Sequence, residues 1–194
     1  MKQFLFLILV CCSSIFIAQV PDYYNDVNLS LTGVNLKVAL ATKITNTHTN
    51  NLSYTPDIWE ASKITDINPD NSNEILLIYG YEDGSDTDIT NNRVAGINDN
   101  GSGSGLWNRE HVYSNSLATP NLDDSSENGP PYADAHNLRP CNGQRNSSRG
   151  NRKFSDSTGT ESGETSESYT NSNGNNQNGW YPGDEWKGDV ARMM

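Results

Sequence analysis

The chain of 194 residues contains three histidines, and His111 has the surroundings best suited to chemistry. It follows Glu110 in the segment LWNREHVY at residues 106–113, where apolar side chains flank the Glu-His pair. A neutral imidazole, with an ordinary pKa of about 6.5, is a natural general base, and a carboxylate is a natural ligand for Mg²⁺. Adjacent residues on a strand point to opposite faces, so the two groups can approach one centre only where the strand ends. An ordinary surface pair is the alternative interpretation.

A second group of residues indicates an anion-binding site. Within residues 136–153 the charged side chains are all basic: Arg139, Arg145, Arg149, Arg152 and Lys153. Residues 146–154 predict the start of a helix capped by Asn146 or Ser147, and a helix N-terminus among basic side chains favours phosphate. Asn151, one turn into that helix, would offer an amide oxygen, which suits Mg²⁺ or Ca²⁺. A solvated basic loop is the alternative.

The overall charge of the chain opposes this interpretation at first sight. The formal net charge is −11, which disfavours a nucleic-acid partner if the charge is spread evenly. The acid-free stretch at residues 136–153 therefore predicts a local anion site and not a general polycation.

Two helices are expected near the beginning of the chain, where apolar residues recur at helical spacing. Residues 29–44 predict an amphipathic helix. Residues 54–64 predict a shorter one, with Thr55 as its cap and Pro56 in its first turn.

Three further segments have clear patterns. The continuous apolar run within residues 74–81 predicts a buried strand. Residues 155–179 are polar and nearly without apolar side chains, so we expect a mobile surface loop of no assigned function. Asp184 is expected to cap a helix over residues 185–194. The chain stops inside that helix, so further helices are expected beyond Met194.

The first residues are typical of an export signal. Residues 1–18 contain one early positive charge and a short apolar run, which fit a cleaved secretory signal peptide and a secreted or periplasmic protein. A lipid anchor on Cys11 or Cys12 is the alternative. Cleavage would leave residues 19–194 as one domain with no membrane segment and with Cys141 as its single cysteine.

The motifs, taken in order, resemble those of the bacterial endonuclease I family. The similar segments are residues 54–59 (YTPDIW), 75–79 (ILLIY), 107–111 (WNREH), 136–140 (HNLRP), 146–152 (NSSRGNR) and 185–192 (EWKGDVAR). That family consists of periplasmic or extracellular nucleases of the His-Me finger (ββα-metal) group. The resemblance implies an α+β fold with a ββα-metal core and additional helices around it. Its strands would lie around residues 106–112 and 136–140, and its helix would start at about residue 147.

The resemblance also implies roles for individual residues. His111 would be the general base that activates water, and Glu110 and Asn151 would hold Mg²⁺, with Ca²⁺ or Mn²⁺ as alternatives. Contacts to phosphates or to transition-state charge are expected from four arginines, Arg109 and Arg149 as catalytic groups and Arg139 and Arg152 as substrate-phosphate groups. His136 and Asn137 would have structural roles near the site, with Asn137 hydrogen bonded to backbone.

The predicted function is a secreted, metal-dependent endonuclease that cleaves DNA, and RNA as well, without sequence specificity. It is expected to act as a monomer. A secreted carbohydrate- or surface-binding module is the alternative, but it predicts no joint role for Glu110 and His111. A zinc hydrolase is disfavoured because histidine and cysteine ligands at suitable spacings are too few.

Overall fold

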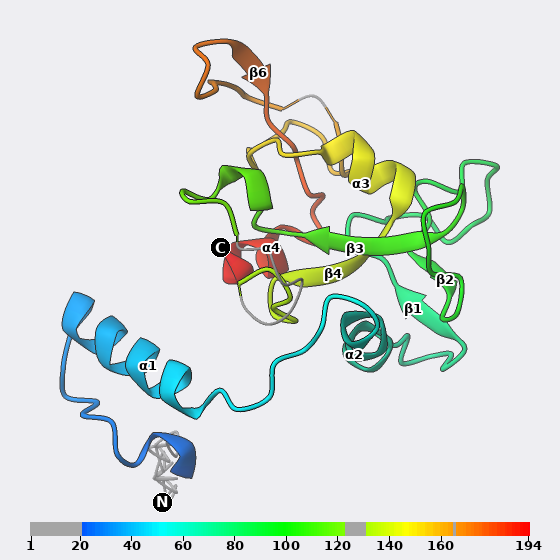
Figure 1. Ribbon diagram of the computed structural model, residues 1–194. Helices are drawn as coiled ribbons and strands as arrows, with labels where there is room; N and C mark the ends of the chain where they lie inside the picture. Colours follow the sequence, from blue (N-terminus) through cyan, green and yellow to red (C-terminus); the bar gives the residue numbers. More distant parts are fainter. Residues whose placement is uncertain (1–20, 123–130, 165) are drawn as a thin grey trace, which may run out of the picture. The chain divides into compact units, whose positions relative to one another are not determined.

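The computed structural model describes residues 21–122, 131–164 and 166–194 (Figure 1). The expected signal peptide at residues 1–18 lies outside the described residues. The chain divides into two compact units, Met1–Thr49 and Asn50–Met194. Within the described ranges, no helix is both long enough and apolar enough to cross a lipid bilayer.

The first unit contains a short 3-10 helix, η1 (Asp22–Tyr24), and the helix α1 (Gly33–Thr47). The helix expected over residues 29–44 is confirmed, although it begins and ends later. Lys43 forms an ion pair of 2.8 Å with Asp26.

The second unit combines helices with small antiparallel sheets, which confirms the expected α+β class. Its described residues form three two-stranded sheets, β1 (Glu74–Leu76) with β2 (Val94–Gly96), β3 (Trp107–His111) with β4 (Leu138–Asn142), and β5 (Ser168–Thr170) with β6 (Asn176–Asn178). Its helical elements are α2 (Asp57–Thr65), η2 (Asn115–Leu117), α3 (Gly143–Arg149) and α4 (Lys187–Met193).

The β3–β4 hairpin continues directly into α3, and these three elements carry most of the expected site residues (Figure 1). The strands pair with Glu110 opposite Arg139 and with His111 opposite Leu138. The two strands were expected around residues 106–112 and 136–140, so their existence is confirmed and the second begins slightly later. Trp107 and Leu138 are fully buried, which fixes this hairpin to the core.

The start of α3 differs from the prediction. Its cap is Asn142, not Asn146 or Ser147, because the Oδ1 atom of Asn142 accepts hydrogen bonds from the backbone N–H groups of Gln144, at 2.9 Å, and Arg145, at 3.2 Å. The helix consequently starts and ends earlier than expected. Asn151 therefore lies after the end of α3, beyond Gly150, and not one turn into it.

The apolar run at residues 75–79 is buried as predicted, but only its beginning belongs to the strand β1. Leu77, Ile78 and Tyr79 are each no more than 2% exposed. The N–H of Leu77 donates at 2.8 Å to the carbonyl of Arg93, just before β2, and the N–H of Ile78 donates at 2.8 Å to the carbonyl of Pro140 in β4. The run thus connects one sheet to the next.

The helices α2 and α4 were both expected, but the side chains predicted to cap them do not do so. Neither α2 nor α4 has a side-chain cap hydrogen bond. Asp184 instead forms an ion pair of 2.6 Å with Lys187. Trp186 fixes α4 by donating its indole N–H to the carbonyl of Gly80 at 2.7 Å.

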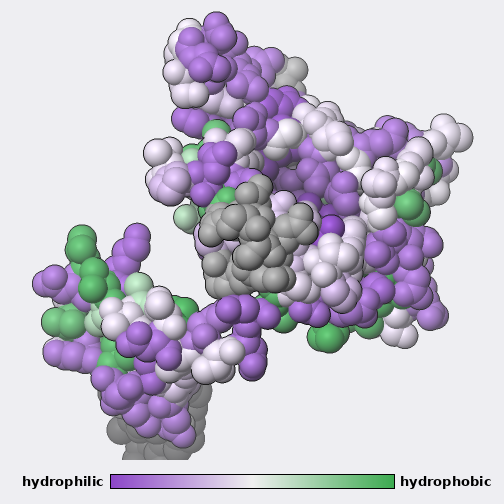
Figure 2. Space-filling model, viewed as in Figure 1, coloured by the Kyte–Doolittle hydropathy of each residue, from purple (hydrophilic) through white to green (hydrophobic). Residues whose placement is uncertain are grey.

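The polar segment at residues 155–179 was expected to be a mobile loop, and this prediction is wrong in part. It contains the β5–β6 hairpin, which projects as a hydrophilic surface at the top of Figure 2. Ser162 is buried, and it donates a hydrogen bond to the carbonyl of Tyr79 and accepts one of 2.8 Å from Arg145. Hydrogen bonds, and not apolar burial, hold this segment in place.

Replacing Asn142 with Ala should lower the free energy of unfolding by about 2 kcal/mol, because two backbone N–H groups lose their acceptor. The carbonyl of Ile89 also loses its donor, the Nδ2 group of Asn142 at 3.1 Å. Urea denaturation followed by circular dichroism measures this loss. Ser147→Ala is the matched control and should cost less than about 0.5 kcal/mol, because Ser147 is exposed. Equal losses in the two variants would contradict the assignment of the cap.

Candidate active site

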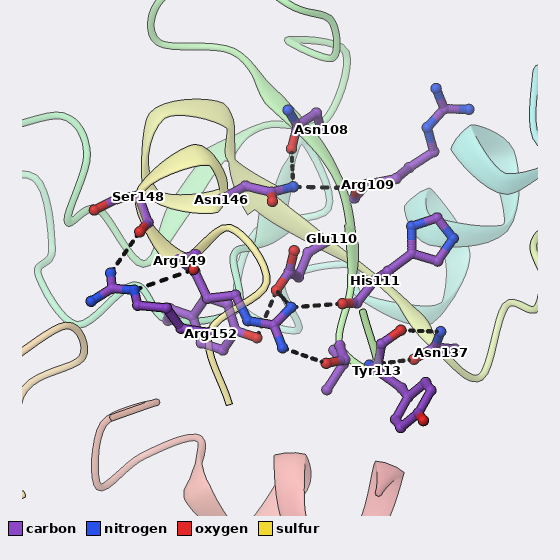
Figure 3. Close-up of polar contacts among 12 residues, drawn as sticks. Asn108, Arg109, Glu110, His111, Tyr113, Asn137, Asn146, Ser148, Arg149 and Arg152 are labelled. Atoms are coloured by element: carbon purple, nitrogen blue, oxygen red, sulfur yellow. Dashed lines mark hydrogen bonds and ion pairs between the residues drawn. The ribbon is translucent and has the colours of Figure 1, made fainter. Parts of the chain in front are cut away.

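A hollow of about 260 Å³ lies where the end of β3 faces the end of α3. Three consecutive residues of β3 line it, Arg109, Glu110 and His111, and Asn151 lines it from the other side. Figure 3 shows how the strand and the helix present their polar side chains to one another. Arg149 of α3 lines it as well, so the structure brings together five of the residues that the sequence analysis proposed.

Glu110 is almost completely buried, with 2% of its surface exposed. Its Oε1 atom accepts two hydrogen bonds, from the hydroxyl of Tyr79 and from the guanidinium of Arg149, both at 2.9 Å. Its Oε2 atom accepts none from the described residues. Burial raises the pKa of Glu110 to about 7, although Arg149 and Tyr79 act in the opposite direction.

Arg149 reaches from α3 to the end of β3 and is only 2% exposed (Figure 3). Besides Glu110, it donates to the carbonyl of His111 at 2.9 Å and to that of Val112 at 2.8 Å. A buried guanidinium with these partners holds the strand end and the carboxylate in position. Arg149 also lines the hollow, and its expected contact with phosphate or with transition-state charge stays a prediction.

Tyr79 is a residue of the site that the sequence analysis did not single out. Its backbone has φ 69°, a left-handed conformation that is uncommon for a bulky side chain. Burial raises the pKa of Tyr79 well above its ordinary value, so the phenol stays protonated and donates to Glu110. A tyrosine at the end of a buried apolar run needs a partner for its hydroxyl, and this was the available signal.

The hydrogen bond of His111 fixes its tautomer. The Nε2 atom lies 2.8 Å from the carbonyl oxygen of Tyr132, and because a carbonyl only accepts, Nε2 carries the proton. The lone pair is then on Nδ1, which has no hydrogen bond to the described residues. The ring stacks on Tyr54 with centroids 5.8 Å apart. Burial lowers the pKa of His111, and the charges of Arg109 and Arg149 lower it further, so the ring is neutral near pH 7.

Arg109 lines the hollow beside His111 and rests on aromatic rings. Its guanidinium carbon lies 3.6 Å from the ring centroid of Tyr54 and 4.0 Å from that of Trp59. It also donates to the carbonyl of Tyr54 and, at 2.8 Å, to the hydroxyl of Thr55. These contacts fix a cation at the edge of the hollow.

Asn151 is exposed and held by one hydrogen bond. Its Nδ2 group donates to the hydroxyl of Ser116 at 3.1 Å, which leaves its Oδ1 atom without a hydrogen bond to the described residues. Asn146, which the sequence analysis considered only as a cap, ties α3 to β3 because its amide donates to Asn108 at 2.7 Å and to the carbonyl of Arg109 at 3.2 Å.

The two arginines expected to bind substrate phosphates lie elsewhere. Arg139 forms an ion pair of 2.5 Å with the buried Asp66. Arg152 donates to the carbonyl of Ser148 at 2.6 Å, and its guanidinium lies 4.6 Å from the ring of Trp180. It lines a separate hollow. Neither arginine lines the hollow of Glu110, and their expected contacts with substrate phosphates stay predictions.

The two expected structural residues, His136 and Asn137, have different outcomes. Asn137 accepts a hydrogen bond of 2.7 Å from the N–H of Tyr113 and donates one of 3.1 Å to its carbonyl, as expected. The side chain of His136 is 99% exposed, and its nearest ionic partner is Asp134, at 3.3 Å. His136 therefore does not orient a group of the site.

The donor set of the hollow fits a hard divalent cation. Among the described residues, no cluster of three His, Cys, Asp or Glu side chains could hold a metal ion. The hollow is lined by one carboxylate among its described residues, that of Glu110, and by the amide side chains of Asn115, Asn146 and Asn151. Mg²⁺ keeps several of its waters and is commonly bound by few protein oxygens, whereas structural zinc needs four Cys or His ligands.

Comparisons with known proteins show the family of the chain. Residues 32–194 match the family described as Endonuclease I. The extracellular ribonuclease of Bacillus subtilis (strain 168) is 39% identical over 179 residues, which cover 91% of this chain and 52% of that protein. The extracellular ribonuclease of Bacillus amyloliquefaciens is 37% identical over 179 residues, with the same coverage of 91% and 52%. The chain thus spans about half the length of the curated relatives it matches.

No solved structure matches the chain. The family match, however, covers most of its residues and includes the whole hollow. The chain therefore belongs to the endonuclease I family.

Proposed function

We propose that this chain hydrolyses phosphodiester bonds of nucleic acids as a secreted, metal-dependent endonuclease. The observation that carries the proposal is that His111, Glu110 and Asn151 line the same hollow. The relatives are named extracellular ribonucleases, which supports RNA as a substrate and a location outside the cell. Cleavage of DNA and the absence of sequence specificity are proposed from the family, and a monomeric state stays a prediction.

We also infer that β3, β4 and α3 form a ββα-metal core. Two features support this inference: the antiparallel hairpin runs directly into the helix, and the proposed base and ligands lie at the junction of these elements. The cap of α3 and the Asn146 bridge to β3 give the junction a defined geometry.

His111 is the proposed general base. Its Nδ1 lone pair takes a proton from the water that attacks phosphorus, and the positive charge that forms on the ring is stabilised by the Tyr132 carbonyl at Nε2. Because the pKa of His111 is lowered, the ring is unprotonated and ready to act as a base near neutral pH.

Glu110 and Asn151 are the proposed ligands of a divalent cation, preferably Mg²⁺, with Ca²⁺ or Mn²⁺ as alternatives. When bound, such an ion neutralises charge on the scissile phosphate and on the leaving oxygen. Arg109 presents its guanidinium at the edge of the same hollow, where it can contact phosphate oxygens. Arg149 acts indirectly, because it holds the Glu110 carboxylate in position.

The alternative of a carbohydrate- or surface-binding module gains no support. It gives no reason for a buried carboxylate beside a histidine of fixed tautomer, and the family match is to nucleases.

His111→Ala should lower the rate of cleavage by about 10²- to 10⁴-fold, the usual contribution of a general base. The assay is hydrolysis of RNA and of supercoiled plasmid by the full-length protein with Mg²⁺. His136→Ala is the matched control and should leave the rate unchanged, because its side chain is exposed outside the hollow. Full activity of His111→Ala would refute the assignment of the base.

Chelation by EDTA should abolish cleavage, and added Mg²⁺ should restore it. Asn151→Ala should weaken binding of the metal roughly tenfold or more, the scale of loss for a group that supports a metal site. Binding of Mn²⁺, followed by electron paramagnetic resonance, measures this without turnover. Asn98→Ala is the control, because Asn98 is exposed and does not line the hollow. Cleavage that persists in EDTA, or unchanged Mn²⁺ binding by Asn151→Ala, would contradict the proposal.

A further inference from the structure

A second hollow, of about 440 Å³, lies against the β5–β6 hairpin and is called here the hairpin groove. Its walls come from the turn at η2, from the chain just after α3 and from the hairpin itself. It shares Ser116 and Asn151 with the candidate active-site hollow, so the two adjoin. Its volume lies within the range of about 300–1,000 Å³ that is typical of sites for small ligands. A molecule in the hairpin groove would therefore reach the proposed metal ligand.

The lining of the hairpin groove is suited to an anion. In a chain with a net charge of −11, the described residues of this lining include no acidic residue. Lys153 contributes an exposed ammonium group, and amide side chains such as Asn171 and Gln177 contribute donors and acceptors. Arg139 and Arg149 of the same basic stretch are, by contrast, engaged in ion pairs inside the protein.

Tyr169 gives the hairpin groove an aromatic wall. It pairs with Gln177 across the hairpin, so the two side chains lie on one face of the sheet. Its hydroxyl accepts a hydrogen bond of 3.2 Å from the N–H of Lys153 and lies 3.3 Å from Oε1 of Gln177, to which it donates. The ammonium of Lys153 lies 5.1 Å from the centre of the ring. The ring is therefore held in place before any ligand arrives.

An immobilised aromatic ring, amide groups and a cation are the groups that recognise an unpaired nucleotide. Bases stack on aromatic side chains, and their free Watson–Crick edges bond to polar groups such as amides. In a duplex, the Watson–Crick edge of each base is already bonded to the partner base. The partner strand would also have to enter the hairpin groove, which has a volume of only about 440 Å³.

We propose that the hairpin groove binds an unpaired nucleotide next to the scissile phosphate, with its base against Tyr169 and its phosphate near Lys153. This inference rests on the proposed function of the adjoining hollow. It makes single-stranded RNA or DNA, or an unpaired end, the favoured substrate.

The test measures binding without turnover. Tyr169→Ala is made in a His111→Ala background of the full-length protein. Fluorescence anisotropy then follows binding to a labelled single-stranded RNA, a DNA of the same sequence and a blunt duplex. Tyr169→Ala should weaken binding to the single strands by about tenfold or more, the effect of losing one stacked base. Binding to the duplex should change little.

Two matched variants separate stacking from a structural effect. Tyr169→Phe keeps the ring but loses the two hydrogen bonds of the hydroxyl, so it should lose clearly less affinity than Tyr169→Ala. Ser168→Ala is adjacent on the same strand but does not line the hairpin groove, so it should have no effect. If Tyr169→Phe lost as much affinity as Tyr169→Ala, or if the duplex lost as much as the single strands, the proposal would be wrong. A similar loss for RNA and DNA would support recognition of the base alone, and a loss confined to RNA would support an added contact to ribose.

A substrate without a base separates this inference from the proposed function. Hydrolysis of bis(p-nitrophenyl) phosphate needs only the candidate active-site hollow. If the full-length protein with His111 intact, loaded with Mg²⁺, did not hydrolyse this ester or any nucleic acid, the proposed function would fail. The anisotropy result would then still decide whether the hairpin groove binds unpaired nucleotides.

Discussion

The buried contact between Glu110 and Arg149 is the interaction on which the site depends. It joins β3 to α3, and Tyr79 joins it to the apolar run after β1. Loss of either charged partner would leave the other buried and uncompensated, which typically costs about 3–5 kcal/mol. The same contact uses one oxygen of Glu110 and leaves the other to the hollow. Structural support and proposed metal binding are thus divided between the two oxygens of one carboxylate.

The distribution of charge explains how an acidic chain can have a site for phosphate. Most arginines of the basic stretch serve the protein itself: Arg139 pairs with Asp66, and Arg149 pairs with Glu110. Among the described residues, the cations that line the adjoining hollows are Arg109, Arg149 and Lys153. A small number of cations, in linings where Glu110 is the single acidic residue that the structure describes, produces a local field that the net charge does not reveal.

Local patterns in the sequence predicted the elements but not their long-range partners. Helical spacing located α1, and the apolar run located the buried segment that ends at Tyr79. The ordered motifs located the β3–β4 hairpin and the residues of the hollow, because those residues are close in sequence to the strand ends. The partners of Arg139 and Arg149 are far away in the chain, so no periodicity could indicate that both arginines are engaged. Cap assignments failed for a similar reason, because small polar residues occur at several neighbouring positions around each helix start.

The segment at residues 155–179 illustrates a further limit of prediction from composition. Its low apolar content predicted a loop, since such a segment cannot offset its ordering entropy by burying apolar surface. The compensation comes from hydrogen bonds to the rest of the protein, such as those that Ser162 makes with Tyr79 and Arg145. A polar segment that is ordered in this way keeps amide and hydroxyl groups on its surface. A bound nucleotide can form hydrogen bonds with those groups. The polar composition that led to the prediction of a loop therefore also suits this segment to the proposed binding of a nucleotide.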